Sequence, residues 1–164
     1  MSYFNEAIKI NPQESTGYNN RGYIYFLKNE FDRALADLNE AIRLNPKSPR
    51  PYFHRAGVSQ AKGEYDPALA DYDEAIRNNP NEFEAFNGRG DTHQAKQQYD
   101  LAIADYNEAI RLSPDYALAF ANRGDAYQAK QDYDHAIADY DQAIRFNPNN
   151  TVAFNPIRYT HGCG

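Results

Sequence analysis

Cysteine is almost absent from this chain, which excludes one way of stabilising a fold. Cys163 is the only cysteine among 164 residues. A single thiol cannot form a disulfide within the chain, and chains without structural disulfides are typical of reducing compartments. The first ten residues, MSYFNEAIKI, also lack the basic segment and the following apolar run of a signal peptide. We therefore expect a soluble, cytoplasmic protein.

Long apolar runs and an excess of positive charge are missing as well. The longest apolar run, Tyr23–Leu27, is far shorter than the ~20 residues that cross a bilayer. The net charge is −6 and the isoelectric point is near 5.2. Because nucleic acids are bound largely through Lys and Arg that neutralise phosphates, this balance argues against nucleic acid and against an anionic membrane surface as partners. The predicted partner is a protein or peptide, and a basic one suits an acidic chain.

Residue sets that catalyse reactions or hold metals are also missing. The sequence contains no GxSxG, HExxH or CxxC motif, and its histidines have no metal-ligand spacing. Gly88-Arg89-Gly90 falls inside a predicted helix with no strand before it, so it does not match a phosphate loop. We therefore predict a protein that is not an enzyme and that has no cofactor. The isolated histidines are His54, His93, His135 and His161.

What the sequence does contain is a period of 34 residues. Prolines, arginines and aspartates recur at this spacing without an insertion or deletion. Such a period is typical of a solenoid, in which a unit that cannot bury its apolar face alone buries it against its neighbours. The recurring prolines are Pro12, Pro46, Pro80, Pro114 and Pro148.

Each period predicts two amphipathic helices that are joined by a tight turn and closed by the proline. A half-repeat over 2–14 precedes the complete repeats, and a lone first helix over 151–159 and a flexible tail over 160–164 follow them. The predicted fold class is all-α, a single solenoid over 2–159 built as an α-α superhelix of antiparallel helix pairs. The complete repeats are 15–48, 49–82, 83–116 and 117–150. The first helices are expected at 15–28, 49–62, 83–96 and 117–130, and the second helices at 31–44, 65–78, 99–112 and 133–146.

Small residues recur where the paired helices are expected to touch. Gly22, Gly90 and Gly124 lie in predicted first helices, although glycine costs a helix ~1 kcal/mol relative to alanine. A cost that is repeated in this way predicts a close approach between two helices. Recurring alanines of the second helices are expected to form the facing surface. They are Ala34, Ala68, Ala102 and Ala136.

This pattern resembles that of tetratricopeptide repeat proteins. Aromatic, Gly, Tyr, Ala, aromatic, Ala and Pro follow one another at the diagnostic places in four full repeats. The resemblance implies a right-handed superhelix with a concave groove that is lined by the first helices. It also implies a non-catalytic scaffold that binds a protein or peptide in that groove.

One departure from the family pattern is shared by all four repeats. The family usually has leucine before the small residue of the first helix, and often an aromatic residue at a fixed place in the second helix. Arginine and aspartate stand there instead, and both places fall on the inner faces of their helices. We interpret them as a ladder of Arg–Asp pairs between paired helices, with solvated surface charge as the alternative. The residues are Arg21, Arg55, Arg89 and Arg123, with Asp37, Asp71, Asp105 and Asp139.

The family resemblance also indicates which residues face the groove. By position in the repeat, the first of these residues are aromatic and the last are polar and acidic, which suits a peptide with an apolar anchor and a basic segment. Simple solvation of a helix face is the alternative. The candidates are Asn19, Tyr23, Phe26, Phe53, Gly57, Gln60, Asn87, Asp91, Gln94, Ala121, Asp125 and Gln128, flanked by Asn20, His54 and Asn122.

Some family members clamp the carboxylate at the end of a chaperone tail with basic residues of the first helices. Basic residues are absent at the matching places of this chain, so we expect it not to bind the acidic tails of heat-shock chaperones. The matching places hold Asn19, Tyr23, His54, Glu84 and Gly88.

The two half-repeats leave two alternatives open. Together they would make one repeat between two molecules, with Val152, Phe154 and Ile157 as the apolar face that is offered. The region around Tyr23, Phe26 and Leu27 is a candidate receiving surface. Head-to-tail contacts of this kind lead to filaments unless they close. The second alternative is that the chain is a fragment of a longer repeat protein, whose neighbouring repeats cover both ends.

Overall fold

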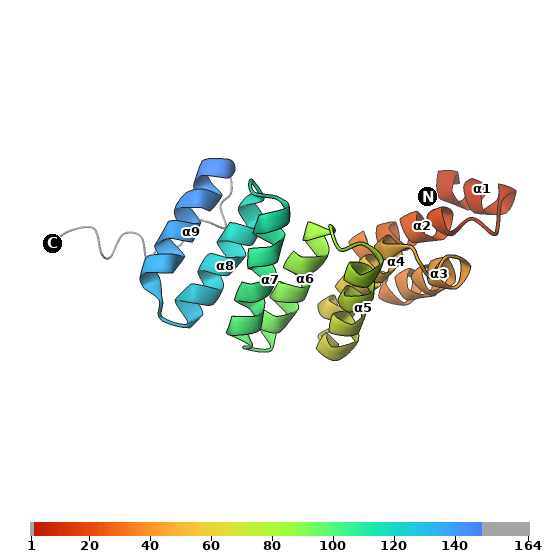
Figure 1. Ribbon diagram of the computed structural model, residues 1–164. Coiled ribbons are helices and arrows are strands. Elements are labelled where there is room, and N and C mark those ends of the chain that lie inside the picture. Colours follow the sequence, from red (N-terminus) through yellow and green to blue (C-terminus); the bar gives the residue numbers. More distant parts are fainter. Residues whose placement is uncertain (1, 149–164) are drawn as a thin grey trace. The chain divides into compact units, whose positions relative to one another are not determined.

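The computed structural model describes residues 2–148, and within them it is built of helices without strands (Figure 1). Successive helices pair side by side and are joined by short turns. The observed bounds agree with the predicted ones to within one residue, so the all-α prediction is confirmed. The helices are α1 (Ser2–Ile10), α2 (Ser15–Leu27), α3 (Phe31–Leu44), α4 (Pro49–Ala61), α5 (Tyr65–Asn78), α6 (Phe83–Ala95), α7 (Tyr99–Leu112), α8 (Ala117–Ala129) and α9 (Tyr133–Phe146).

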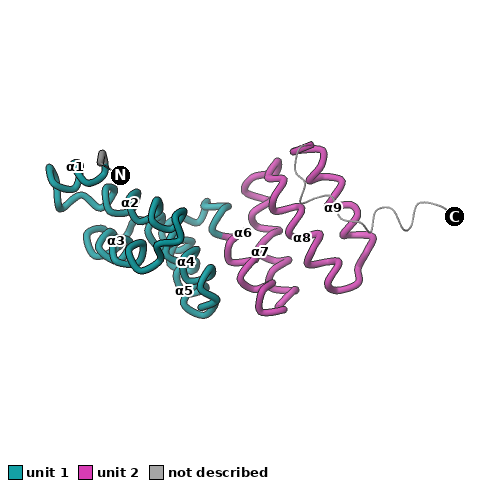
Figure 2. The backbone as a smooth tube through the Cα atoms, turned by 180° about the vertical axis from the view of Figure 1, so that it is seen from behind, with its two compact units in different colours: residues 1–85 teal, residues 86–164 magenta. Residues whose placement is uncertain are grey.

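The chain forms two compact units, residues 1–85 and residues 86–164 (Figure 2). The first unit contains α1 to α5 and the first residues of α6, and the second unit contains the rest of α6 with α7, α8 and α9. Each unit is described by itself below. The single solenoid over 2–159 stays a prediction.

The second helices are amphipathic, and they bury a face of small and apolar side chains. Ala34, Leu38 and Ala41 of α3 recur at helical spacing and are fully buried. In the first unit α2 packs on α3 and α4 packs on α5, while α3 also contacts α4. In the second unit α8 packs between α7 and α9. Each helix therefore buries its apolar face on its neighbours along the chain, as expected for a repeat protein.

The glycines of the first helices mark close contacts, as predicted. A Cβ atom at Gly22 would lie 2.9 Å from Leu38 Cγ, and one at Gly90 would lie 2.7 Å from Tyr106 Cε1. At Gly124 the Cβ atom would lie 2.8 Å from Tyr140 Cε1. Large side chains therefore occupy the space that each glycine leaves open. Leu38, Tyr106 and Tyr140 thus face these glycines in addition to the predicted alanines.

The turn inside each helix pair ends the first helix with a left-handed residue. Asn29, Gly63, Gln97 and Gln131 have φ values of 59°, 76°, 60° and 63°. In the turn after α4, Gly63 N–H donates to Gln60 O over 2.9 Å and Glu64 N–H donates to Ser59 O over 2.9 Å. This pair of bonds is the Schellman motif, which satisfies carbonyls that the helix end would leave without partners.

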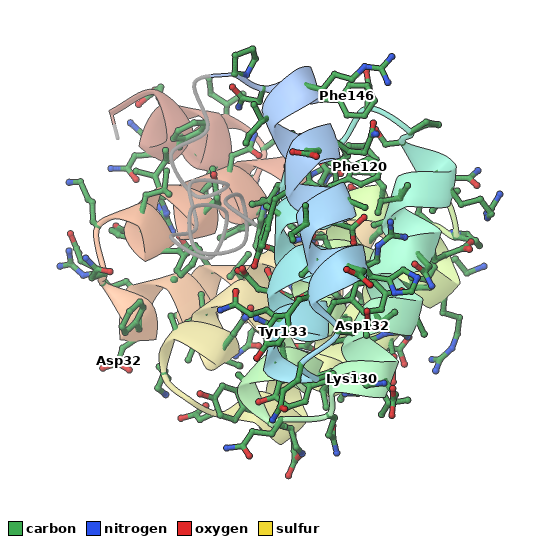
Figure 3. The ribbon with its side chains drawn as sticks, turned by 90° about the vertical axis from the view of Figure 1, so that its left-hand side faces the viewer. Asp32, Phe120, Lys130, Asp132, Tyr133 and Phe146 are labelled. Atoms are coloured by element: carbon green, nitrogen blue, oxygen red, sulfur yellow. The ribbon has the colours of Figure 1, made fainter. Side chains whose placement is uncertain are left out.

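Aromatic side chains of α8 and α9 meet at one end of this helix pair. The rings of Phe120 of α8 and Phe146 of α9 lie 5.6 Å apart and are tilted by 31° (Figure 3). Lys130, Asp132 and Tyr133 lie at the opposite end of the α8–α9 pair, beside its turn. The Phe120–Phe146 contact lies at the end of the α8–α9 pair that is remote from this turn.

Candidate functional site

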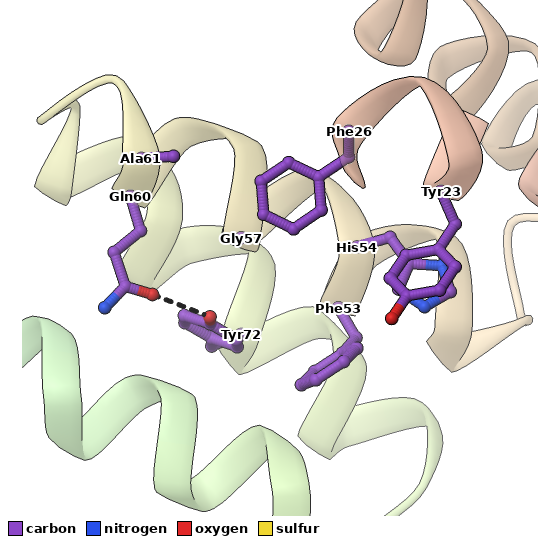
Figure 4. A pocket seen from close by; sticks show the side chains of 8 residues that line it. All are labelled: Tyr23, Phe26, Phe53, His54, Gly57, Gln60, Ala61 and Tyr72. Carbon is purple, nitrogen blue, oxygen red and sulfur yellow. Dashed lines mark hydrogen bonds between the residues drawn. The ribbon is translucent and has the colours of Figure 1, made fainter. Parts of the chain in front are cut away.

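An aromatic pocket lies on the first unit, between α2 and α4, with one side chain from α5 (Figure 4). The cavity has a volume of about 450 Å³ and is open to solvent. We call it the aromatic pocket. Its lining residues are Tyr23, Phe26, Phe53, His54, Gly57, Gln60, Ala61 and Tyr72.

Helical spacing gathers these side chains on one face. Tyr23 and Phe26 are three residues apart on α2, so they lie on one side of that helix. Phe53, Gly57 and Gln60 follow one another at four and three residues on α4, which aligns them in the same way. Gly57 forms the floor between the rings, because it has no side chain to fill the space (Figure 4).

The polar atoms of the aromatic pocket are held by internal contacts. The His54 ring stacks on Tyr23 with ring centroids 4.5 Å apart, and its Nδ1 lies 2.9 Å from Asn19 Oδ1. Burial, together with the positive charge of Arg50, lowers the pKa of His54 to about 4. The Tyr72 hydroxyl donates to Gln60 Oε1 over 3.0 Å. At neutral pH the lining therefore carries no formal charge.

The corresponding positions of the second unit are filled with hydrogen-bonded polar groups. The Tyr106 hydroxyl lies 2.8 Å from Asp91 Oδ1 and 3.1 Å from Gln94 Oε1. The Tyr140 hydroxyl makes the same two contacts, to Asp125 Oδ1 over 2.6 Å and to Gln128 Oε1 over 2.8 Å. At this position of the repeat the second unit has Asp91 and Asp125, whereas the first unit has Tyr23 and Gly57.

Asp91 is enclosed by donors from three helices. Asn122 Nδ2 of α8 donates to Asp91 Oδ1 over 2.8 Å, and Asn87 Nδ2 of α6 donates to Asp91 Oδ2 over 3.2 Å. The third donor is the Tyr106 hydroxyl of α7. Burial raises the pKa of Asp91 to about 6, although the bonds from Tyr106 and Asn122 act against the shift. Burial also raises the pKa of Asp125.

The predicted groove residues thus fall into two groups. In the first unit Tyr23, Phe26, Phe53, His54 and Gln60 line one cavity, and Asn19 is buried behind His54. In the second unit the predicted side chains take part in hydrogen bonds around two tyrosine hydroxyls. Those side chains are Asn87, Asp91, Gln94, Asn122, Asp125 and Gln128.

The hydrogen bonds of the Tyr72, Tyr106 and Tyr140 hydroxyls were not predicted from the sequence. A signal for them was present. Glutamine and tyrosine occur together in repeats two to four, whereas the first repeat has Phe26 and Leu38 at these two places. Such paired replacement is expected where two positions are in direct contact.

The structure brings the arginines and aspartates of the proposed ladder together. Arg21 Nε and Nη2 donate to the two carboxylate oxygens of Asp37, both over 2.7 Å. Arg123 does the same with Asp139 over 2.8 Å and 2.6 Å. The Arg55–Asp71 and Arg89–Asp105 pairs repeat this geometry at 2.6 to 3.0 Å. These ion pairs are bidentate, and their aspartates are buried.

Each of these arginines also makes contacts that the sequence analysis did not name. The guanidinium of Arg123 lies over the Phe120 ring, 5.5 Å from its centroid, and Nη1 donates to Asn107 Oδ1 of α7 over 2.5 Å. Arg55 repeats both contacts with Tyr52 and Asn39. The asparagines recur at multiples of the repeat period, which is the signal that would have found them. Arg123 therefore joins three successive helices of the second unit.

The residues predicted for self-association, Val152, Phe154 and Ile157, lie outside the described residues. A second cavity of about 420 Å³ lies between α1 and α2 and includes Phe4, Ile10 and Gly17 in its lining. Within residues 2–148 no helix is long and apolar enough to cross a membrane.

Family models match most of the repeat array. A model described as "Tetratricopeptide repeat" matches residues 15–48 and 117–150, and a second model of that description matches residues 49–82. A model described as "TPR repeat" matches residues 95–131. The matches at 15–48, 49–82 and 117–150 coincide with predicted repeats, and the match at 95–131 spans α7 and α8. The chain is a tetratricopeptide repeat (TPR) protein.

Solved structures share the fold of this TPR protein. A crystal structure of MamA is 21% identical, with a TM-score of 0.78 over 88% of this chain and 85% of that chain. Pseudomonas aeruginosa PilF is 21% identical, with a TM-score of 0.80 over 85% of this chain and 64% of that chain. The first TPR of Spaghetti (RPAP3), bound to the HSP90 peptide SRMEEVD, is 25% identical, with a TM-score of 0.66 over 68% of this chain and 89% of that chain. No curated protein matches the TPR chain in sequence.

Proposed function

We propose that this TPR protein is a non-catalytic scaffold that binds a protein or peptide on the face of its first helices. The aromatic pocket carries the proposal. It is an open cavity of about 450 Å³ on α2 and α4, at the place where the second unit has hydrogen-bonded carboxylates. Concave apolar sites with a few fixed polar groups are the usual form of a ligand site.

Exposed apolar surface beside the pocket supports the proposal. The side chains of Tyr23 and Leu27 on α2 are 38% and 58% exposed. Aromatic residues are enriched at the centres of protein interfaces, where they supply large contact areas. The likeness to the first TPR of Spaghetti (RPAP3), whose structure holds a peptide, is consistent with this use of the fold.

The second unit supplies the acidic part of the predicted groove. Asp91 and Asp125 lie on its first helices and keep their carboxylates close to tyrosine hydroxyls. A basic segment of a partner would meet complementary charge there. The acidic tail of a heat-shock chaperone would not, and Glu84 adds a further negative charge at a place where other members have a basic residue. We therefore expect no micromolar binding of such a tail in a titration.

A peptide selection with matched variants tests this proposal. Peptides that bind the full chain are selected from a random displayed library and titrated against three proteins: the wild type, Gly57→Asp and Ala36→Asp. Gly57→Asp fills the pocket with the residue type that two other repeats carry at this place, so that Tyr72 gains the partner that Tyr106 and Tyr140 have. Ala36→Asp adds the same charge at an exposed position of α3.

We expect the selected peptides to lose ~10-fold or more in affinity for Gly57→Asp, since filling the cavity removes an apolar anchor worth 1–3 kcal/mol. Affinity for Ala36→Asp should remain. Equal binding of all selected peptides to the wild type and Gly57→Asp would place the interaction elsewhere and remove the support for the pocket.

Self-association is the second candidate function. The cavity between α1 and α2 favours it, because it is a receiving surface in addition to the region around Tyr23, Phe26 and Leu27. Ile10 beside this cavity is 77% exposed, so an apolar surface is offered at that side of the first unit. The predicted occupant is the segment 151–159 of a second copy. Light scattering over a range of concentrations, with the full chain and with a chain that ends at residue 150, tests this. A full chain that stays monomeric at high concentration contradicts it.

A further inference from the structure

We infer that the aromatic pocket takes an uncharged aromatic side chain of the partner and excludes a cationic one. This inference rests on the proposed function and names the ligand class of the same site. Rings alone do not decide this point, because an aromatic cage is also the usual receptor for quaternary ammonium groups and methylated lysine. The charges around the rings separate the two ligand classes.

The first observation is that the pocket lining lacks the carboxylate that a buried cation would need. Asp91 and Asp125 occupy the corresponding place in the third and fourth repeats, whereas the two repeats that form the pocket have Tyr23 and Gly57 there. None of the eight lining residues is acidic. A cation that enters this cavity gives up water without gaining a counter-charge, and this cost is large in an apolar site.

The second observation is a positive charge that already stands at the edge of the pocket. The guanidinium of Arg50 lies over the Phe53 ring, 5.8 Å from its centroid. Arg50 Nη2 is 3.0 Å from Glu82 Oε1 and 3.8 Å from Glu84 Oε2, so these two carboxylates are ion-paired with Arg50. A second cation would be repelled by Arg50, and the Phe53 ring already makes a cation–π contact with Arg50.

The third observation is the arrangement of the rings. Phe53 and Tyr72 meet edge to face at 6.0 Å and 62°, and Tyr23 and Phe26 are tilted by 46° at 6.5 Å. The rings of the pocket therefore present both faces and edges to the space above Gly57 (Figure 4). An inserted aromatic ring can make offset-stacked and edge-to-face contacts at once, which aliphatic side chains do not offer.

Small neutral and charged probes test the inference directly. The full chain is titrated with N-acetyl-phenylalaninamide, N-acetyl-leucinamide and N-acetyl-lysinamide, while the backbone amide signals of Gly57 and Ala61 are followed by NMR. We expect the phenylalanine amide to shift both signals in a saturable manner and to bind about threefold or more tighter than the leucine amide. The lysine amide should give no saturable shift.

Two variants and one control connect the shifts to the pocket. The two variants are Gly57→Asp and Phe26→Gln. Phe26→Gln gives the first repeat the glutamine that the other repeats have as Gln60, Gln94 and Gln128. Both variants should abolish binding of the phenylalanine amide while the helical circular dichroism signal is retained. For Gly57→Asp the signal of Ala61 is followed. Ala36→Asp should bind as the wild type does.

Saturable binding of the lysine amide, leucine binding equal to phenylalanine, or no shift with any probe would each overturn the inference. The first two results leave the proposed function standing, because the pocket would still bind a side chain. Loss of the proposed function shows itself differently, as selected peptides that bind Gly57→Asp and the wild type equally well.

Discussion

Single positions of the repeat decide what each repeat can do. The Arg–Asp pair is kept in all four repeats and holds each helix pair together, whereas the position of Gly57, Asp91 and Asp125 changes from repeat to repeat. The Arg and Asp side chains of the pair serve packing and charge pairing. At the position of Gly57, Asp91 and Asp125, a carboxylate fills the space beside a tyrosine hydroxyl, whereas a glycine leaves that space open.

The buried ion pairs lead to the first prediction. Arg123→Leu leaves the Asp139 carboxylate buried with no counter-charge, so we expect the free energy of unfolding to fall by about 3–5 kcal/mol. Arg123→Leu combined with Asp139→Tyr should recover most of this loss, because the pair then matches the apolar residues usual in the family. Chemical denaturation followed by circular dichroism measures both effects.

Arg111→Leu is the matched control. Arg111 is exposed on α7 and pairs with Glu108 of its own helix, so its removal should change stability little. A double variant no more stable than Arg123→Leu alone would mean that the buried pair does not account for the loss.

At the scale of the element, the helix pairs depend on their turns. Each first helix ends in a Schellman motif at the same place of the repeat, although only Gly63 is the residue best suited to it. Asn29, Gln97 and Gln131 adopt the same left-handed backbone with a side chain attached. Three turns therefore carry a local strain that the fourth lacks.

Exchanging residues between the turns gives the second prediction. Gln97→Gly should raise the free energy of unfolding by ~0.5–1 kcal/mol, since glycine adopts a φ of 60° without steric cost. Gly63→Gln should lower it by a similar amount, although nothing lies within 4 Å of a Cβ atom built at Gly63. Thermal unfolding of both variants measures the effect. Shifts of the same sign in the two variants would contradict it.

At the scale of the whole molecule, the two units bury titratable groups of opposite kinds. The first unit holds a histidine whose pKa is lowered from 6.5 to about 4, and the second holds an aspartate whose pKa is raised from 3.8 to about 6. Burial causes both shifts because it disfavours the charged form of each group. Stability in repeat proteins is close to a sum of local terms, so each unit should respond for itself.

The third prediction is that the two units change stability in opposite directions between about pH 6.5 and pH 4. Unfolding lets His54 take up a proton in this range, so the first unit loses stability as the pH falls. Folded Asp91 binds its proton more tightly than unfolded Asp91, so the second unit gains stability over the same range. Either change is at most about 3 kcal/mol. Hydrogen exchange of α4 and α8 amides, corrected for intrinsic rates, measures it.

His54→Asn and Asp91→Asn are the controls for this response. Each variant should weaken the pH dependence in its own unit and leave the other unit as it was; Asp125 and Glu84, whose pKa values are also raised, keep a smaller response. Parallel changes in both units of the wild type would contradict the prediction.

Most of the fold was predictable because it depends on short-range patterns. The repeat period placed eight helices to within one residue, and the shared Arg and Asp positions indicated which side chains would meet. The pocket was less predictable. Tyr23 and Phe53 were identified as facing the groove, but the role of Gly57 as an open floor became clear only beside the Asp91–Tyr106 contact.

The sequence by itself determined the helix pairs and their family, because periodicity and turn chemistry act within a few residues of the chain. Tertiary structure alone decided which polar atoms are engaged. Asn122 reaches Asp91 across 31 residues, and Tyr72 reaches Gln60 across 12. A hydrogen bond forms or fails over less than one ångström, and that precision comes from the packing of whole helices, which no local pattern encodes.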